Sequence, residues 1–339
     1  MQRIAAAVVA LAAISAQAQS ASYAIAIHGG AGNFTRADLP PETERQQRAA
    51  LAESLEAGRR VLAAGGSSLD AVVAAVRILE DSPHFNAGKG SVFSSAGINE
   101  MDASIMEGAN RRAGAVAGVT TVKNPITAAR AVMDKSRHVM LAGRGAEQFA
   151  KEQGLEIVDP SYFRTQQRWD QLERAKARAG TPLDHDAPNA GAAKKTSALS
   201  ADEKYGTVGA VALDKAGNLA AATSTGGITN KRYGRVGDSP IIGAGTWAEN
   251  ESVAVSMTGT GEMLLRSATA HDIAALVKYK GYTPRKAADE ALAEVKALDG
   301  RGGAIVMDRT GDAAFSFNTT AMYRGLAKGS APAEIHIYR

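Results

Sequence analysis

The chain has 339 residues, of which 45% are hydrophobic and 22% are charged, and its formal net charge is +4. The small basic excess is spread thinly and aromatic residues make up only 5%, so a charged face and stacking surfaces for nucleic acid are both missing. The absence of cysteine excludes disulfides and thiol catalysis. We therefore expect a globular enzyme or binding protein whose partner is a small molecule or dipeptide, not a nucleic acid.

The first 18 residues differ from the rest of the chain. An unbroken apolar run from Ile4 to Ile14 follows Arg3 and precedes Ala16-Gln17-Ala18. The run is too short to span a bilayer, which needs about 20 residues, and the small residues after it are typical of a cleavage site. The pattern predicts a signal peptide, residues 1–18, a periplasmic or secreted product, and no membrane partner. A buried N-terminal helix is the alternative.

The region up to residue 179 alternates strand and helix patterns. We expect strands over 23–27, 100–106 and 115–122, and helices over 41–64, 67–82, 126–134, 144–153 and 168–179. The glycine-rich stretch His28-Gly29-Gly30-Ala31-Gly32 follows the first strand. His28 is a candidate general base or a histidine that only satisfies nearby backbone.

A compact loop, residues 84–91, follows the second helix and contains Asn86 and two glycines. Such a loop can direct several carbonyl groups at a cation or place the Asn86 amide beside a reactive group. An ordinary turn is the alternative.

Residues 180–203 contain almost no apolar anchors. A structureless stretch of this length is unusual inside a compact domain and is typical of a lid, a linker or a processing site. Because exposed polar segments are where chains are cut, its position before Thr207 favours processing, with a flexible linker over about 180–206.

Thr207 follows Gly206 and opens the apolar run 208–213. If the bond between Gly206 and Thr207 is cut, Thr207 carries both a hydroxyl and a free α-amine. That amine has a pKa of about 7.7–8.0 and can accept the hydroxyl proton. The alternative is an ordinary strand that opens with a β-branched residue.

The remaining chain predicts strands over 208–213, 219–223, 252–257, 304–307 and 314–317, and helices over 263–280 and 284–298. Strands and helices in blocks favour packed sheets covered by helices over an alternating parallel fold.

Three glycine-rich segments in this region carry candidate binding groups. Arg235 can clamp a carboxylate and Asp238 can bind an ammonium, so the pair matches the two ends of an α-amino acid; an exposed ion pair is the alternative. The Thr258–Gly261 segment joins a strand to a helix, where backbone N–H groups favour negative charge, including an anionic intermediate. The spacing Gly243-x-Gly245-x-x-Ala248 resembles half of a dinucleotide fingerprint, but no βαβ pattern follows it.

Six motifs in order resemble the plant-type L-asparaginase / isoaspartyl peptidase family of N-terminal-nucleophile hydrolases. They are His28-Gly29-Gly30-Ala31-Gly32, Phe85-Asn86-Ala87-Gly88-Lys89-Gly90, Gly206-Thr207-Val208-Gly209, Thr223-Ser224-Thr225-Gly226-Gly227, Gly234-Arg235-Val236-Gly237-Asp238-Ser239-Pro240 and Thr258-Gly259-Thr260-Gly261. The resemblance implies an α+β fold, an αββα four-layer sandwich, in which a precursor cuts itself between Gly206 and Thr207. It also implies an α subunit of residues 19–206 and a β subunit of residues 207–339, which form one folded domain and an (αβ)₂ heterotetramer.

The resemblance also implies roles for individual residues. The implied catalytic residues are Thr207 as nucleophile, Thr225 as its hydrogen-bonding partner, and Thr258 with Gly259 as the oxyanion hole. The implied substrate-binding residues are Arg235, Val236, Gly237, Asp238, Thr258, Gly259, Thr260 and Gly261. Asn86 would support the nucleophile. No cofactor is implied for catalysis, but a structural sodium ion is, held by Leu79, Glu80, Ser82, Phe85, Ala87 and Lys89.

The implied reaction is hydrolysis of β-aspartyl peptides and L-asparagine through a β-aspartyl-enzyme, with release of L-aspartate. A glycosylasparaginase is one alternative, although that branch typically carries Asn in place of Gly226 and Thr260. An uncleaved amino-acid-binding protein that uses Arg235 and Asp238 without turnover is another.

Overall fold

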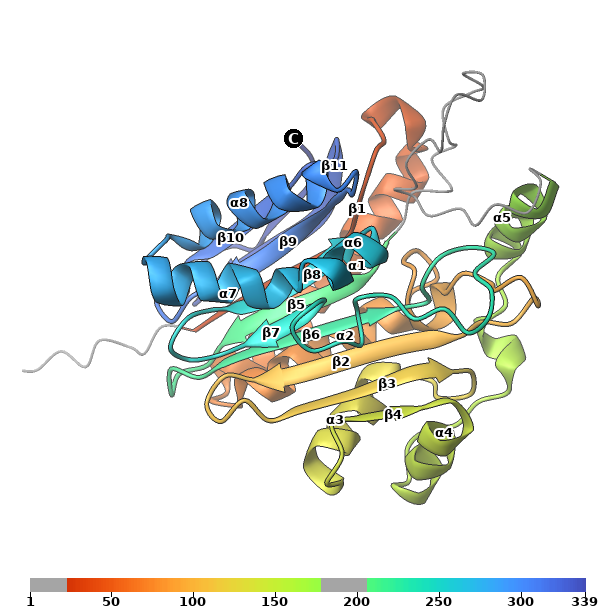
Figure 1. The fold of residues 1–339 in the computed structure, drawn as a ribbon, viewed down its shortest axis with the longest axis horizontal. Helices are drawn as coiled ribbons and strands as arrows, with labels where there is room; N and C mark the ends of the chain where they lie inside the picture. The colour runs from red at the N-terminus through yellow and green to blue at the C-terminus, as the bar shows by residue number, and fades with distance from the viewer. Residues whose placement is uncertain (1–22, 178–205) are drawn as a thin grey trace, which may run out of the picture.

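The computed structural model describes residues 23–177 and 206–339, shown in Figure 1. The helices are α1 (Pro41–Ala63), α2 (Ser68–Asp81), α3 (Pro125–Lys135), α4 (Gly143–Glu152), α5 (Gln166–Ala177), α6 (Gly261–Arg266), α7 (Thr269–Lys280) and α8 (Pro284–Ala297), with 3₁₀ turns at Arg36–Asp38, Gly88–Gly90 and Pro160–Phe163. The strands are β1 (Ala24–Gly32), β2 (Met101–Glu107), β3 (Ala113–Val119), β4 (Met140–Ala142), β5 (Val208–Leu213), β6 (Leu219–Thr225), β7 (Thr246–Ala248), β8 (Ala254–Gly259), β9 (Gly302–Met307), β10 (Ala313–Phe317), β11 (Ala321–Lys328) and β12 (Glu334–Tyr338).

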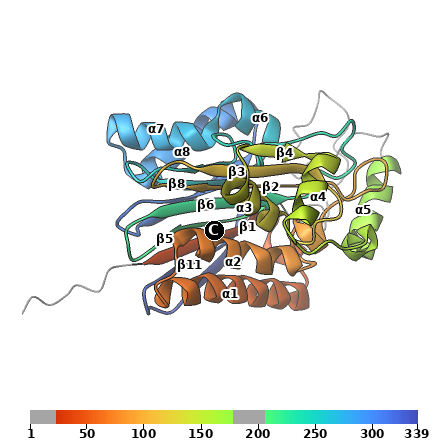
Figure 2. The ribbon, with the colours of Figure 1, turned by 90° about the horizontal axis from the view of Figure 1, so that it is seen from below.

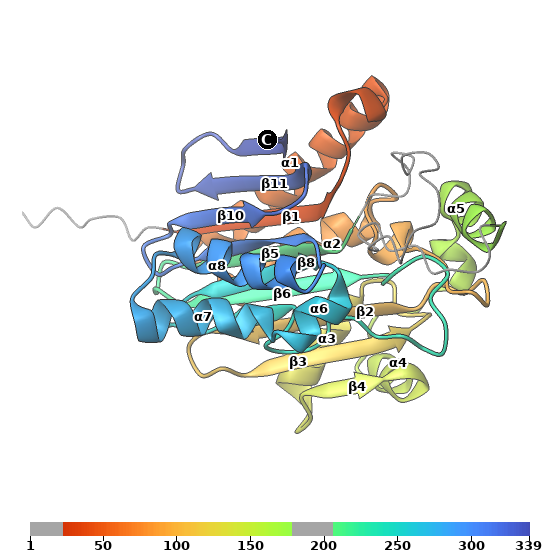
Figure 3. The same cartoon turned by 45° about the horizontal axis from the view of Figure 1, so that its top comes forward.

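The strands form two sheets that pack face to face. The larger sheet has the order β12-β11-β1-β5-β6-β2-β3-β4 and the smaller has the order β10-β9-β8-β7. Helices α1, α2 and α3 cover the outer face of the larger sheet, and α7 and α8 cover that of the smaller (Figures 1 and 2). Figure 3 shows α7 and α8 in front of the strands that they cover. The predicted α+β, four-layer αββα arrangement is confirmed.

The central strands are buried on both faces. Their alternating side chains point in turn toward the covering helices and toward the second sheet. In β5, Val208, Ala210 and Ala212 pack toward the helices, whereas Val211 and Leu213 pack toward the second sheet. Because successive side chains point to opposite faces, Thr207 belongs to the side that faces the second sheet. The predicted nucleophile therefore lies between the two sheets.

Two features differ from the expected elements. The predicted single helix over 263–280 is wrong: it divides into α6 and α7, and Ala268 between them has φ of +46°, a left-handed conformation that interrupts helical hydrogen bonding. Strands β4, β7, β11 and β12 were not predicted. β4 and β7 are only three residues long and β12 is an edge strand, where alternation is weak, whereas β11 is an eight-residue strand that pairs with both β1 and β12.

The predicted signal peptide lies wholly, and the 180–206 linker almost wholly, outside the described residues. Within the described residues, no helix combines the length and the apolar character that crossing a membrane requires. Strand β5 pairs with β1 on one side and β6 on the other, so segments before and after the predicted cut share one sheet.

Candidate active site

The Thr207 hydroxyl lies between two other hydroxyl groups. Its Oγ1 hydrogen-bonds to Thr225 Oγ1 at 3.2 Å and lies 3.4 Å from Ser239 Oγ. Thr225 Oγ1 also accepts a hydrogen bond from the Gly227 N–H at 3.1 Å, which orients it. Thr207 is 7% exposed, so this hydroxyl is largely shielded from bulk water. The structure thus places the two hydroxyl groups within hydrogen-bonding distance, and the catalytic role of Thr225 stays a prediction.

The peptide that precedes Thr207 lies against the glycine-rich end of β1. Gly30 has φ of +105°, and a Cβ added to it would lie 2.6 Å from the Gly206 nitrogen. The pairing of β1 with β11 shifts register between His28 and Ala31, which bends the strand at this point. The absence of a side chain at Gly30 therefore lets the backbone of Gly206 approach β1.

Asn86 lies beside the turn that follows Thr225. Its side-chain amide donates to the Gly227 carbonyl at 2.7 Å, and its backbone carbonyl accepts from the Gly226 N–H at 3.1 Å. Its side-chain oxygen accepts from the Val92 N–H at 3.0 Å. These contacts position the segment that carries Thr225, so any support for the nucleophile passes through Thr225.

Thr258 and Gly259 end β8, on the sheet that faces β5. Thr258 Oγ1 is buried and has no hydrogen-bond partner within the described residues, which is unusual for a buried hydroxyl. Gly259 has φ of +150°, and a Cβ there would lie 2.3 Å from the Arg301 carbonyl oxygen. An oxyanion would complete the hydrogen bonding of Thr258. Thr260 has a different environment, because its Oγ1 accepts a hydrogen bond from the Arg301 N–H at 3.1 Å.

Arg235 and Asp238 converge on Gly261. A Cβ added to Gly261 would lie 2.6 Å from Arg235 Nη2 and 3.1 Å from Asp238 Oδ1. The next residue, Glu262, accepts two hydrogen bonds of 2.9 Å from the Nε and Nη2 of Arg235. Burial acts to raise the pKa of Glu262, but these hydrogen bonds and the positive charge together outweigh burial and lower it. Glu262 was not predicted from the sequence, because nothing in its spacing indicates that it meets Arg235.

Val236 and Gly237 lie within the same loop, and Gly237 is also close to the arginine. A Cβ there would lie 2.8 Å from Arg235 Nη1. The guanidinium of Arg235 therefore packs against the backbone of Gly237, and a side chain at that position would displace it.

A buried lysine lies behind this loop. The Lys231 ammonium donates to the Glu100 carbonyl oxygen at 2.7 Å and is 1% exposed at the side chain. Burial lowers the pKa of Lys231, while the nearby negative charges of Asp102 and Glu100 oppose that shift. Burial raises the pKa of Asp102, while Lys231 opposes that change. The hydrogen bond from Lys231 to the Glu100 carbonyl therefore ties the segment between β6 and Arg235 to the residue that precedes β2.

The sequence of this chain is similar to those of known proteins. A family model described as "Asparaginase" matches residues 21–337. The chain belongs to the asparaginase family. This confirms the resemblance inferred from the six motifs, and the family is one of N-terminal-nucleophile hydrolases.

Proteins similar to this chain occur in bacteria and animals. The "Isoaspartyl peptidase" of Salmonella typhimurium is 49% identical over 317 residues, which cover 93% of this chain and 98% of that protein. The "Isoaspartyl peptidase" of Escherichia coli is also 49% identical, with 93% and 96% covered. The human "Isoaspartyl peptidase/L-asparaginase" is 41% identical over 310 residues, with 90% and 92% covered.

The resemblance implies a sodium ion held by backbone carbonyl groups. No cluster of three or more His, Cys, Asp or Glu side chains suited to a metal occurs in the described parts of the chain. A Cβ on Gly88 would lie 2.2 Å from the Glu80 carbonyl oxygen, and one on Gly90 would lie 2.0 Å from that of Phe85. These glycines let the loop close tightly around its own carbonyl groups, so the residues present fit an oxygen-liganded cation.

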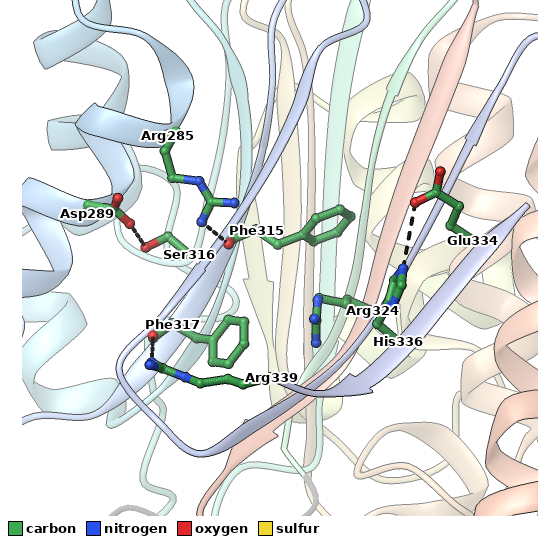
Figure 4. A pocket seen from close by; sticks show the side chains of 9 residues that line it. All are labelled: Arg285, Asp289, Phe315, Ser316, Phe317, Arg324, Glu334, His336 and Arg339. Carbon is green, nitrogen blue, oxygen red and sulfur yellow. Dashed lines mark hydrogen bonds and ion pairs between the residues drawn. The ribbon is translucent and has the colours of Figure 1, made fainter.

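A separate cavity of about 530 Å³ lies where β10 meets β11 and β12, and none of its lining residues belongs to the predicted site (Figure 4). Arg339 donates to the Phe317 carbonyl oxygen at 2.7 Å, and Arg285 donates to that of Phe315. Because β10 is an edge strand, these bonds occupy carbonyl groups that another strand would otherwise pair with. The arginines here protect a sheet edge.

Proposed function

We propose that this chain is a self-cleaving hydrolase of β-aspartyl peptides and L-asparagine. The observation that carries the proposal is the position of the Thr207 hydroxyl, which contacts both Thr225 and Ser239. Ser239 directly follows Asp238, so the nucleophile lies next to the residues that recognise an α-amino acid.

Self-cleavage begins when Thr207 Oγ attacks the Gly206 carbonyl carbon. The C–N bond breaks, the nitrogen becomes the Thr207 α-amine, and an ester joins Gly206 to the threonine oxygen. Water then hydrolyses the ester and leaves a carboxylate on Gly206. The products would be the proposed subunits 19–206 and 207–339.

In the mature enzyme, the α-amine of Thr207 accepts the hydroxyl proton as the oxygen attacks the substrate β-carbonyl. Thr258 Oγ and the Gly259 N–H would stabilise the oxyanion. Arg235 would bind the α-carboxylate and Asp238 would bind the α-ammonium. The leaving amine takes the proton, and water releases L-aspartate from the β-aspartyl ester.

Denaturing gels and N-terminal sequencing test this proposal directly. The expected result is two fragments, with the smaller one reading Thr-Val-Gly from its first residue. A single intact band after prolonged incubation, without turnover, would support an amino-acid-binding protein instead. Hydrolysis of β-Asp-Leu and L-asparagine should exceed hydrolysis of glycosyl-asparagine, and the reverse order would favour a glycosylasparaginase.

We further propose that the carbonyl groups of the loop hold a structural sodium ion; the residues are Leu79, Glu80, Ser82, Phe85, Ala87 and Lys89. Such an ion supplies no catalytic step, but its charge would stabilise the loop that carries Asn86. Replacing sodium by a bulky organic cation should lower the melting temperature, and an unchanged melting temperature argues against the site.

Export and assembly are also proposals. Removal of residues 1–18 would yield a periplasmic or secreted protein, and cell fractionation with N-terminal sequencing of the larger fragment tests this. Light scattering should give the mass of an (αβ)₂ heterotetramer, whereas the mass of a single αβ unit would contradict that assembly.

A further inference from the structure

The cavity of about 530 Å³ between β10, β11 and β12 contains three arginine side chains. Arg285 comes from the first turn of α8, Arg324 lies on β11, and Arg339 follows β12 (Figure 4). Two aromatic residues of β10, Phe315 and Phe317, line the same cavity. Volumes of about 300–1,000 Å³ are typical of sites for small molecules. We call the three arginines the arginine cluster.

The guanidinium groups of the arginine cluster lie close to one another. Arg285 donates to the carbonyl oxygen of Phe315. Arg339 donates to that of Phe317, which is two residues further along β10 and therefore about 7 Å away. The Cζ atoms of Arg324 and Arg339 lie 5.1 and 5.0 Å from the centre of the Phe317 ring, so these two cations are at most about 10 Å apart. Three positive charges therefore share one small region.

Within residues 23–177 and 206–339, no carboxylate forms an ion pair with the arginine cluster. Asp289 and Glu334 line the same cavity, but both have other partners. Asp289 accepts a hydrogen bond from the Ser316 hydroxyl, and a carboxylate oxygen of Glu334 lies 3.6 Å from His336 Nε2. Figure 4 shows these two carboxylates at opposite sides of the cavity, with the arginines between them.

The positive charges of the arginine cluster repel one another. Burial lowers the pKa of Arg324, and the charges of Arg285 and Arg339 lower it further, while no negative group in the described parts of the chain opposes the shift. An anion bound in the cavity would replace part of this repulsion by attraction.

The arginine cluster also keeps hydrogen-bond donors for a ligand. Each guanidinium has five N–H groups. Among the residues that the structure describes, Arg285 and Arg339 each use one of them for a carbonyl oxygen of β10, and Arg324 uses three for carbonyl oxygens of β11 and β12. The other N–H groups can donate to a ligand, and the planar fork of a guanidinium matches the oxygens of a phosphate or a carboxylate.

The charge and geometry of the arginine cluster favour a phosphate group over a single carboxylate. One negative charge would compensate only part of three positive charges, so a polyvalent anion fits better. The oxygens of a phosphate are arranged as a tetrahedron, and three guanidinium groups can each donate to a different oxygen. Because Arg324 is half-buried beside an aromatic ring, water screens these charge-assisted hydrogen bonds less than it does at an open surface.

We propose that the arginine cluster is a binding site for a small molecule that carries a phosphate group. The hydrogen bonds that protect the edge of β10 also hold Arg285 and Arg339 at the cavity, so the site is partly preorganised. The proposal goes beyond the proposed function and does not depend on it, because none of the lining residues belongs to the proposed active site.

Isothermal titration of the purified protein with inorganic phosphate tests the site. Sodium concentration and ionic strength are held constant with sodium chloride, because salt screens exposed charges and a sodium ion is proposed elsewhere in the protein. We expect saturable binding with a Kd of about 1 mM or tighter, and roughly tenfold tighter binding of pyrophosphate, which carries more charge. Absence of saturable phosphate binding, or weaker binding of pyrophosphate, overturns the proposal.

Substitution by glutamine removes one positive charge but keeps a side-chain donor for the carbonyl groups. We expect Arg285→Gln and Arg324→Gln each to weaken phosphate binding about tenfold. Arg309→Gln is the matched control, because Arg309 is another exposed arginine that donates to a backbone carbonyl oxygen, that of Gly217, and it lies outside the cavity. The affinity of Arg309→Gln for phosphate should stay within about twofold of wild type.

Melting temperatures measured without phosphate separate loss of the site from loss of the fold. Arg324 bonds to both β11 and β12, so Arg285→Gln decides the result if Arg324→Gln does not fold. Wild-type affinity for phosphate in a folded Arg285→Gln overturns the proposal.

Two further titrations test where the anion binds and of which class it is. Arg235→Ala should bind phosphate as the wild type does, and loss of binding in that variant would place the anion in the proposed active site and overturn the proposal. Tighter binding of succinate than of phosphate would assign the arginine cluster to dicarboxylates and reject the phosphate assignment.

Discussion

Substitution of Gly30 by alanine should slow self-cleavage of the precursor. Gly30 has φ of +105°, which a residue with a Cβ rarely adopts, and the added Cβ would lie 2.6 Å from the Gly206 nitrogen. Backbone atoms on both sides of that contact leave no flexible side chain to move aside. Strain of this type costs about 1–3 kcal/mol. Because each 1.36 kcal/mol changes a rate tenfold, we expect cleavage to be roughly 10–100 times slower if relief of the strain displaces Gly206.

Gly65→Ala provides a matched control for backbone strain alone. Gly65 also has a positive φ, +85°, but an added Cβ would have no atom within 4 Å. The assay is a time course of freshly purified precursor on denaturing gels, with melting temperatures for both variants. Cleavage of Gly30→Ala at the rate of Gly65→Ala would refute the argument that the Gly30 contact holds the scissile peptide in place.

Three further predictions concern single residues. Arg235→Ala should leave the rate of self-cleavage within threefold of wild type. It should raise KM for L-asparagine about 30-fold, because a hydrogen bond to a charged group contributes about 2 kcal/mol. A matching loss of self-cleavage would show that Arg235 serves the nucleophile as well. Thr258→Val, which keeps the shape but removes an oxyanion donor, should lower kcat about 100-fold, and a kcat within threefold of wild type would exclude that donor. The pKa of His28 is lowered by burial from its ordinary 6.5 to about 3, so the unfolded chain binds an extra proton between these pH values and stability falls as the pH drops below 6.5. The free energy of unfolding of the wild type, measured in urea, should fall by up to about 1.4 kcal/mol per pH unit between pH 5.5 and 4 because of His28. The His28→Asn variant should lack this part of the pH dependence. Identical pH dependence in the two proteins would contradict the prediction.

Much of the site was predictable because its residues lie in short motifs with demanding local chemistry. Thr207 after a glycine, Arg235 three residues before Asp238, and Thr258-Gly259 at the end of a strand are local patterns. The structure places Thr207 beside Thr225, and Arg235 beside Asp238 around Gly261. Their proposed roles in substrate binding and catalysis stay predictions that the experiments above test.

Other groups could not be found from spacing. Glu262 meets Arg235 across 27 residues, and Asn86 reaches the nucleophile only through the turn after Thr225. The sequence also suggested His28 as a general base, whereas burial keeps its ring neutral and its Nε2 faces Ser256.

The sequence by itself determined the periodicity of the strands, the positions where only glycine fits, and the chemical groups available to the reaction. Tertiary structure alone decided which hydroxyl groups meet. Ser104, Thr223, Thr246 and Ser256 lie on four strands of two sheets, and each points between the sheets only because of its place in the pairing register. A shift of one residue in any of these strands would turn its hydroxyl to the opposite face, and pairing between distant strands is not encoded in local spacing.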